Sequence, residues 1–270
     1  MQPTIHTFVP APDLQPFVKQ LLLVESPWLG VDQVVPAWTK SMLVLQYADP
    51  VYSTVNGAAE PVRSITVNGM VSKRYRFTTP ANEIRLFLVE FTEIGAHVLF
   101  RQDAVPFTDF STDATALIPK RHRHQICEAL YEQDNLHRKV ELVESFLRNL
   151  IPESIPRYVD TVQNALAMMR LSGFSSSIQQ IADDMGINRR TLRRHFSRVT
   201  GLAPKMFSRI ERFTAVYNQL VGPGAAATRC RGFSQFYDQS HLIHEFESFT
   251  GYSPTRLPKE RFLIHHLLTV

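Results

Sequence analysis

The sequence predicts an α+β chain of two domains, an antiparallel β-barrel with helices at its C-terminal end, followed by an all-α domain. The length of 270 residues suits two modules of about 100–150 residues each. Short runs of β-branched and aromatic residues fill the first part, whereas helical spacing of apolar residues dominates after residue 156. We therefore place the domains at residues 1–152 and 157–270, on either side of a linker that contains Pro152 and Pro156.

Four strands are predicted in the first domain, at residues 34–35, 41–47, 65–67 and 85–91. The pairs Asn56-Gly57 and Asn68-Gly69 are typical of tight hairpin turns. Residues 121–150 contain neither Gly nor Pro and repeat apolar residues at helical spacing, which predicts one or two amphipathic helices. That face packs either on its own barrel or on a second copy of the chain, and the sequence favours neither.

Several classes of protein are excluded by simple features of the chain. The apolar run at residues 21–24 is far shorter than the ~20 residues of a membrane span. The N-terminus lacks the basic and apolar regions of a secretion signal. Cys127 and Cys230 are the two cysteines, too few for a disulfide framework. We expect a cytoplasmic protein with no membrane partner.

The charge is divided unevenly between the two parts. Residues 1–156 hold 14 Lys and Arg against 17 Asp and Glu, whereas residues 157–270 hold 15 against 8. The first part is thus net negative and the second net positive, which indicates a polyanionic partner for the second part alone. A basic face that is merely solvated is the alternative.

Residues 177–200 fit a helix-turn-helix unit. Ala182 is small where two helices would cross, and Gly186 stands where the turn needs a positive φ. Leu192 would pack the second helix against the first, and Ser177 and Asn188 are suitable N-caps. The unit ends at Gly201.

The outward face of the second helix is rich in arginine. With Leu192 and Phe196 turned inward, Arg190 and Arg194 point away from the core. Such a face without local carboxylates suits DNA phosphates, and arginine also binds the major-groove edge of guanine. The side chains that we expect to bind DNA from this unit are Arg189, Arg190, Arg193, Arg194, Ser197 and Arg198.

Residues 177–196 and 200–205 resemble the DNA-binding domain of the AraC/XylS family of bacterial transcription regulators. Residues 209–213 are similar to that family's linking helix, and residues 237–242 and 246–254 to its second helix-turn-helix and closing signature. The resemblance covers about residues 158–257. The first domain is loosely similar, at residues 87–91 and 100–110, to the cupin-like sensor halves of some members.

The resemblance implies a linking helix at residues 204–220 and a second helix-turn-helix at about 228–250. Its base-reading positions fall on Arg190, Arg193 and Arg194 in the first unit and on Gln239, Ser240 and His244 in the second. Two such helices enter successive major-groove faces about 34 Å apart. Implied partners are double-stranded DNA, RNA polymerase, a small-molecule effector sensed by the first domain and a second copy of the chain. No cofactor is implied.

The second unit departs from the family pattern. The places of its isoleucine-alanine pair and glycine hold Cys230, Arg231 and Gln235, and an arginine would clash at a helix crossing. Glu245 and Glu247 stand where basic residues are common, so phosphates would be repelled there. We therefore expect the first unit to supply most of the affinity for DNA.

Catalytic and metal sites find little support. The paired histidines at 122 and 124 have arginine neighbours, those at 265 and 266 have apolar neighbours, and the strand region offers little beyond His97. Aromatic residues that form either an effector pocket or the core are Trp28, Trp38, Tyr47, Tyr52, Phe77, Phe87 and Phe91. The alternatives left are a cupin-type enzyme with a degenerate helical appendage and an interaction protein that has lost DNA recognition.

Overall fold

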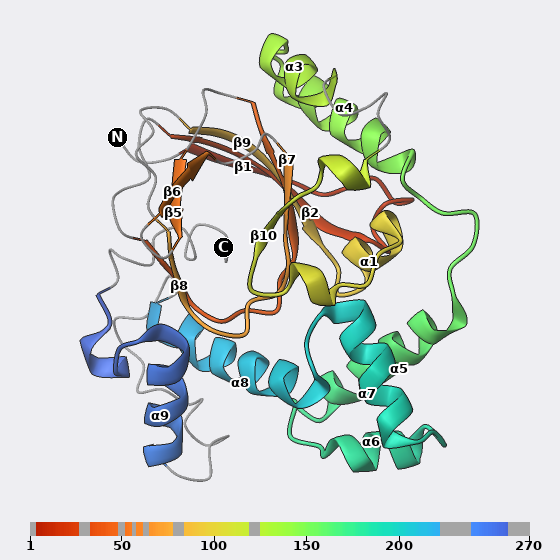
Figure 1. Cartoon of the computed structure of the whole chain (residues 1–270), viewed down its shortest axis with the longest axis vertical. Coiled ribbons are helices and arrows are strands. Elements are labelled where there is room, and N and C mark those ends of the chain that lie inside the picture. The colour runs from red at the N-terminus through yellow and green to blue at the C-terminus, as the bar shows by residue number, and fades with distance from the viewer. Residues whose placement is uncertain are drawn as a thin grey trace.

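The computed structural model describes residues 4–26, 33–47, 52–55, 58–61, 65–77, 84–118, 125–221 and 239–258. Antiparallel strands occupy the N-terminal part and helices the C-terminal part (Figure 1), so the predicted α+β fold class is confirmed.

The N-terminal part contains a six-stranded antiparallel sheet in the order β1-β2-β9-β4-β7-β10 and the two-stranded sheets β3-β8 and β5-β6. The central strands are β2 (Val18–Ser26), β9 (Ile84–Phe91), β4 (Met42–Gln46) and β7 (Ile65–Asn68), with β1 (Thr4–Phe8) and β10 (Ser111–Asp113) at the edges. The smaller sheets contain β3 (Gln33–Val35), β8 (Tyr75–Phe77), β5 (Tyr52–Val55) and β6 (Ala58–Pro61).

Strand β2 was missed by the sequence analysis because it does not alternate between apolar and polar residues. Leu21 and Leu23 belong to the large core cluster, while Leu22 and Val24 belong to a second cluster around Trp38. A strand that is covered on both faces appears in the sequence as a continuous apolar run. The run at 21–24 is therefore the middle of a central strand.

The prediction of a hairpin at Asn68-Gly69 is wrong. Strand β7 pairs with β4 and β10, and Asn68 lies opposite both Met42 and Ser111. Gly69 is needed for close packing instead, because a Cβ there would overlap the backbone carbonyl of Phe107. The other expected turn, Asn56-Gly57, lies outside the described residues, although β5 and β6 pair on either side of it.

Helices α3 (Gln125–Glu132) and α4 (Leu136–Arg148) occupy the predicted helical region 121–150, whose first residues, 121–124, lie outside the described chain. Val143, Phe146 and Leu147 of α4 are buried in the large core cluster. The Arg148 guanidinium donates to Asp13 at 2.7 Å, and Glu144 accepts from the backbone N–H of Ala11 at 2.7 Å. The buried face of α4 is thus used within its own chain.

The short helices α1 (Gly95–Phe100), η1 (Val105–Phe107) and η2 (Thr115–Leu117) follow the strands of the sheet. After α4, the chain has no regular structure until α5 (Arg157–Leu171), which α6 (Ile178–Asp184) and α7 (Arg189–Thr200) follow. Helix α8 (Pro204–Val221) then leads towards α9 (Gln239–Thr250) and η4 (Pro254–Arg256). In the part of the chain that the structure describes, no helix is both long and apolar enough to cross a bilayer.

Helices α7 and α9 lie at opposite ends of α8, and α8 runs along one side of the sheet (Figure 1). One core cluster contains buried residues of the sheet, such as Phe87 and Phe91, together with Phe196 and Phe207 of the helical part. The sheet and the helices therefore share apolar contacts. This continuity holds α7 against the N-terminal part.

Candidate DNA-binding surface

Local hydrogen bonds mark the starts of α6 and α7, and a glycine forms the turn between them. The Ser177 hydroxyl accepts from the backbone N–H of Gln180 at 3.1 Å, and the Asn188 side chain accepts from the backbone N–H of Arg190 at 2.7 Å. Both are N-caps that satisfy free donors at a helix start. Gly186 adopts a φ of +65° between the two helices. The predicted caps and turn glycine are confirmed.

Three apolar side chains fix the rotation of α7. Ala182 of α6 is fully buried, and so are Leu192 and Phe196 of α7, each with an exposed fraction of 1% or less. The Phe196 ring packs edge-to-face on Phe207 of α8 at a centroid distance of 5.4 Å. With this face buried, the opposite face of α7 is turned to solvent.

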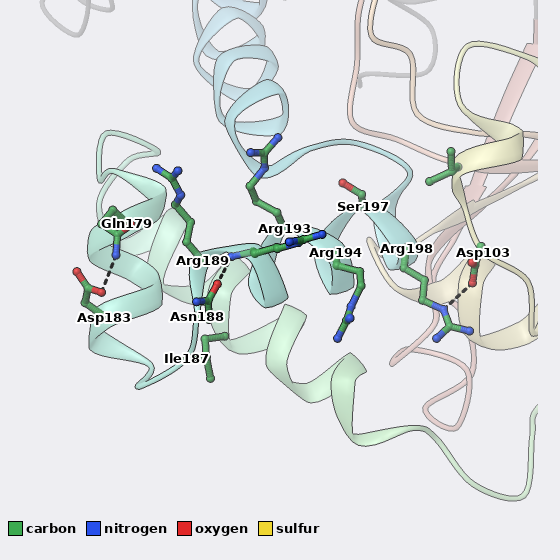
Figure 2. Close-up of a pocket in the computed structure, with 12 residues that line it drawn as sticks. Asp103, Gln179, Asp183, Ile187, Asn188, Arg189, Arg193, Arg194, Ser197 and Arg198 are labelled. Atoms are coloured by element: carbon green, nitrogen blue, oxygen red, sulfur yellow. Dashed lines mark hydrogen bonds and ion pairs between the residues drawn. The ribbon is translucent and has the colours of Figure 1, made fainter.

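That opposite face carries four exposed guanidinium groups, which belong to Arg189, Arg190, Arg193 and Arg194. Among the described residues, none of the four forms an ion pair. They line a concave surface that encloses a volume of about 1120 Å³, together with residues of α6 and of the turn that contains Asp103 (Figure 2). The face therefore presents positive charge that the described part of the chain leaves unmatched.

Arg198 behaves differently from the other arginines of α7. Its Nε donates to Oδ1 of Asp103 at 2.6 Å, and Asp103 belongs to the N-terminal part (Figure 2). The sequence analysis found no local carboxylate for the arginine face, and the partner of this residue is a distant one. The carboxylate lies 95 residues away in the sequence, so no local pattern indicates it.

Tyr158 of α5 forms a junction that the sequence analysis missed. Its hydroxyl lies 2.9 Å from His97 Nε2, its ring lies 5.4 Å from the His195 ring, and the Arg198 guanidinium lies 4.8 Å from its centre. Burial lowers the pKa of both histidines, and the positive charges of Arg194 and Arg198 lower the pKa of His195 further. The junction joins α1, α5 and α7 through one aromatic side chain.

Helices α7 and α9 end in the same way, at positions fifty residues apart. The hydroxyl of Thr200 donates to the carbonyl of Phe196 at 2.9 Å, and that of Thr250 donates to the carbonyl of Phe246 at 2.7 Å. Gly201 and Gly251 then both adopt a φ of +84°, a conformation that glycine adopts at least cost. Helix α9 is the structural counterpart of α7.

The outward face of α9 differs from that of α7. His244 is exposed, whereas the side chains of Gln239 and Ser240 lie outside the described residues. Glu247 is exposed, as a phosphate-repelling residue would be. Glu245, however, is 3% exposed and accepts from Arg209 of α8 at 2.6 Å, so the expectation that it faces DNA is wrong. Cys230, Arg231 and Gln235 lie outside the described residues.

No other chemistry is evident in the described part of the chain, where no three His, Cys, Asp or Glu side chains are placed to hold a metal. Burial raises the pKa of the Cys127 thiol to about 11, which makes it a poor nucleophile at neutral pH. Four of the aromatic residues, Trp38, Tyr47, Phe87 and Phe91, are buried in the core. Trp28, the histidine pairs at 122/124 and 265/266, and the side chains of Tyr52 and Phe77 lie outside the description.

Comparison with known proteins bears on the C-terminal part. A family model described as a helix-turn-helix domain matches residues 181–260. The match confirms the interpretation of this region as a helix-turn-helix domain. It spans α7, α8 and α9, the three helices that carry or connect the two outward faces. No curated protein matches the chain.

Solved structures with some likeness to the chain were also found. ToxT from Vibrio cholerae is 9% identical over 96% of each chain, with a TM-score of 0.49. The AraC-like transcriptional activator CuxR is 12% identical over 80% of this chain and 87% of its own, with a TM-score of 0.27. The cupin domain of Cnp3 from Schizosaccharomyces pombe is 16% identical over 34% of this chain and 66% of its own, with a TM-score of 0.26. At such low similarity, the functional assignment depends on the helix-turn-helix match and on the residues of α7.

Proposed function

We propose that this chain, whose C-terminal part matches a helix-turn-helix domain, is a transcription regulator of the AraC type that binds specific duplex DNA sequences mainly through helix α7. The observation that carries the proposal is the set of four exposed guanidinium groups on one face of α7, with no ion pair to any described residue. Like charges on neighbouring turns repel one another in water. Bound phosphates would relieve that repulsion and release counterions from the DNA.

The arginines differ in what they would contact. Arg190, Arg193 and Arg194 occupy the base-reading positions of the resemblance, and an arginine can donate to both O6 and N7 of a guanine. Arg189 begins the helix and Ser197 lies further along the same concave surface (Figure 2), so we assign both to the DNA backbone. His244, with Gln239 and Ser240, would give α9 a weaker contact with a second half-site.

We further propose that the N-terminal part responds to a small effector or to a second copy of the chain, and that its response alters DNA binding. Support comes from the contacts of this part with α7, through Asp103 and Ala104, and with α5, through the hydrogen bond between His97 and Tyr158. A ligand that favours one arrangement of these contacts would shift the population of DNA-competent molecules.

Selection of bound sequences from a random pool of DNA duplexes tests the proposal. We expect one enriched sequence with a strong half-site for α7 and a weaker one about one helical turn away. A variant in which Arg190, Arg193 and Arg194 are all changed to Gln should enrich nothing. The matched control changes Arg138 and Arg157 to Gln, because both are exposed arginines outside α7.

The outcome separates this function from its rival. If the wild-type chain enriches no sequence while its circular dichroism and thermal unfolding are normal, operator recognition is absent. The chain would then be a protein-interaction module that has retained the fold. If the control variant loses binding as fully as the α7 variant, the arginines of α7 hold no special role.

A further inference from the structure

The N-terminal part contacts the two helix-turn-helix units at equivalent residues. The backbone N–H of Ala104 donates to the carbonyl of Arg198 in α7 at 2.8 Å. The guanidinium of Arg74 donates to the carbonyl of Ser248 in α9 at 3.3 Å. Positions 198 and 248 are fifty residues apart, as are the Thr-Gly ends of the two helices. The same backbone carbonyl is thus held in both recognition helices.

The glycine that ends each helix packs against the N-terminal segment that contacts the carbonyl of that helix. A Cβ at Gly201 would overlap the Thr108 hydroxyl and lie 3.0 Å from the Ala104 carbonyl. A Cβ at Gly251 would lie 2.7 Å from Nε of Arg74. The backbone N–H of Ala37, in the N-terminal part, also donates to the carbonyl of Phe249 in α9 at 3.4 Å. Both helix ends are therefore in close contact with the N-terminal part.

Asp103 adds a charged contact to the first of these two points. Its carboxylate accepts from Arg198, and it lies at the edge of the concave surface that the free arginines line (Figure 2). A duplex seated on that surface would meet a carboxylate there, and Arg198 would be directed away from the phosphates. The Asp103–Arg198 ion pair therefore places a negative charge beside the positive face of α7 and disfavours DNA binding there.

We propose that the N-terminal part is a two-point clamp on the recognition helices, and that its Asp103–Arg198 contact restrains DNA binding until it is released. This inference rests on the proposed function. The clamp consists of Asp103, Ala104 and Thr108 at α7 and of Ala37 and Arg74 at α9. Because the N-terminal part contacts both helix ends, a structural change in it alters the positions of α7 and α9 together.

The strength of the charged contact suits a switch. The side chains of Arg198 and Asp103 are 48% and 53% exposed, and ion pairs this exposed are worth little in water. Phosphates of a bound duplex can therefore compete for Arg198. When the Arg198 guanidinium is released, it contacts the phosphates without the Asp103 carboxylate beside it. A small change in the N-terminal part therefore gives a measurable change in the affinity for DNA.

The first test measures binding of the selected duplex by the variant Asp103→Asn of the full chain. We expect roughly two- to fivefold tighter binding, and a salt dependence steeper by about one phosphate contact. Asp13→Asn is the matched control, since Asp13 also pairs with an arginine at 2.7 Å and is 50% exposed, but lies against α4. The control should bind as the wild type does.

A double variant assigns the effect to Arg198. Arg198→Ala should bind more weakly than the wild type, and Asp103→Asn should then add less than it adds when Arg198 is present. Equal or weaker binding by Asp103→Asn overturns the inference, as does a gain that persists in full without Arg198. If the wild type binds no duplex, the proposed function fails, whereas an unchanged Asp103→Asn beside a binding wild type refutes the clamp alone.

Hydrogen exchange tests the second contact point without DNA. Arg74→Met should speed exchange of the backbone amides in the last turn of α9 and at Gly251, because the carbonyl of Ser248 loses its donor. Exchange in α7 should stay as in the wild type. Unchanged exchange in α9 would show that Arg74 does not hold this helix.

Discussion

Helices α7 and α9 have the same ends and different faces. In the last turn of both, a threonine hydroxyl donates to the carbonyl of a phenylalanine four residues earlier, a glycine at a φ of +84° follows the threonine, and a proline stands three residues after the glycine. Their outward residues diverge, since α7 presents Arg194 and α9 presents His244 at the equivalent position. The shared residues build the helix end, and the divergent ones set the affinity for a polyanion. A fold can therefore be repeated in one chain while its binding strength is not.

The inward faces of α7 and α9 also differ at one equivalent position, which is residue 195 in α7 and residue 245 in α9. His195 of α7 packs on the ring of Tyr158, whereas Glu245, fifty residues on, pairs with Arg209 of α8. Arg209 in turn lies over the Phe249 ring at 5.5 Å. A buried carboxylate that retains its partner does not repel DNA. The acidity of α9 is therefore lower at its surface than its sequence indicates.

The largest expected difference between the two helices is in DNA affinity. Arg194→Ala should weaken binding of the selected duplex by about ten- to a hundredfold, the usual cost of losing a guanine contact. His244→Ala should weaken it by less than about threefold. Fluorescence anisotropy at fixed salt measures both. A greater loss from His244→Ala would reverse the assignment of the strong half-site to α7.

Stability should also separate the two helix ends. Alanine at Gly201 or Gly251 must adopt a φ of +84°, which costs about 1–2 kcal/mol of the free energy of unfolding. Gly201→Ala should cost about 1 kcal/mol more, because its Cβ overlaps the Thr108 hydroxyl and also meets the backbone carbonyl of Ala104, whereas the Cβ of Gly251→Ala meets the long, movable side chain of Arg74. Urea unfolding compares the two variants. Equal losses would show that Gly201 is not tightly packed.

Salt dependence should distinguish the charges of the two faces. Arg189→Gln should lower the slope of log affinity against log salt by about one phosphate contact, because Arg189 is the arginine of α7 that we assign to the DNA backbone. Glu247→Gln in α9 removes a repulsive charge, and we expect binding to tighten by less than about threefold without a lower slope. Titrations at several salt concentrations measure both. An unchanged slope in Arg189→Gln would show that this side chain makes no phosphate contact.

The smallest effect concerns pH. Burial lowers the pKa of His97 in the folded chain, so the unfolded chain takes up a proton first as the pH falls. Stability is therefore complete above about pH 6.5 and declines below it until the folded pKa is passed. The pKa of His195 is also lowered in the folded chain, so its contribution to stability changes with pH in the same direction. The change in melting temperature between pH 7.5 and pH 5.5 should be smaller in His97→Gln than in the wild type, and an equal change would contradict the buried neutral state.

Local sequence patterns were sufficient for the helices of the first unit. The caps at Ser177 and Asn188 and the glycines at 186 and 201 are short-range features whose partners lie within a few residues. Four strands were found from their composition, but β2 was missed because burial on both faces removes the alternation that marks a strand. The pair Asn68-Gly69 misled because its glycine serves a packing contact with Phe107 rather than a turn.

The amino-acid sequence by itself determined the arginine face of α7, because helical spacing and the burial of Leu192 and Phe196 settle which side chains point outward. Only the tertiary structure decided that Arg198 is held by Asp103 and that Glu245 is turned inward to Arg209. Those partners are 95 and 36 residues apart. Contacts over such separations depend on how the sheet and helices pack, which a local pattern of residues does not specify.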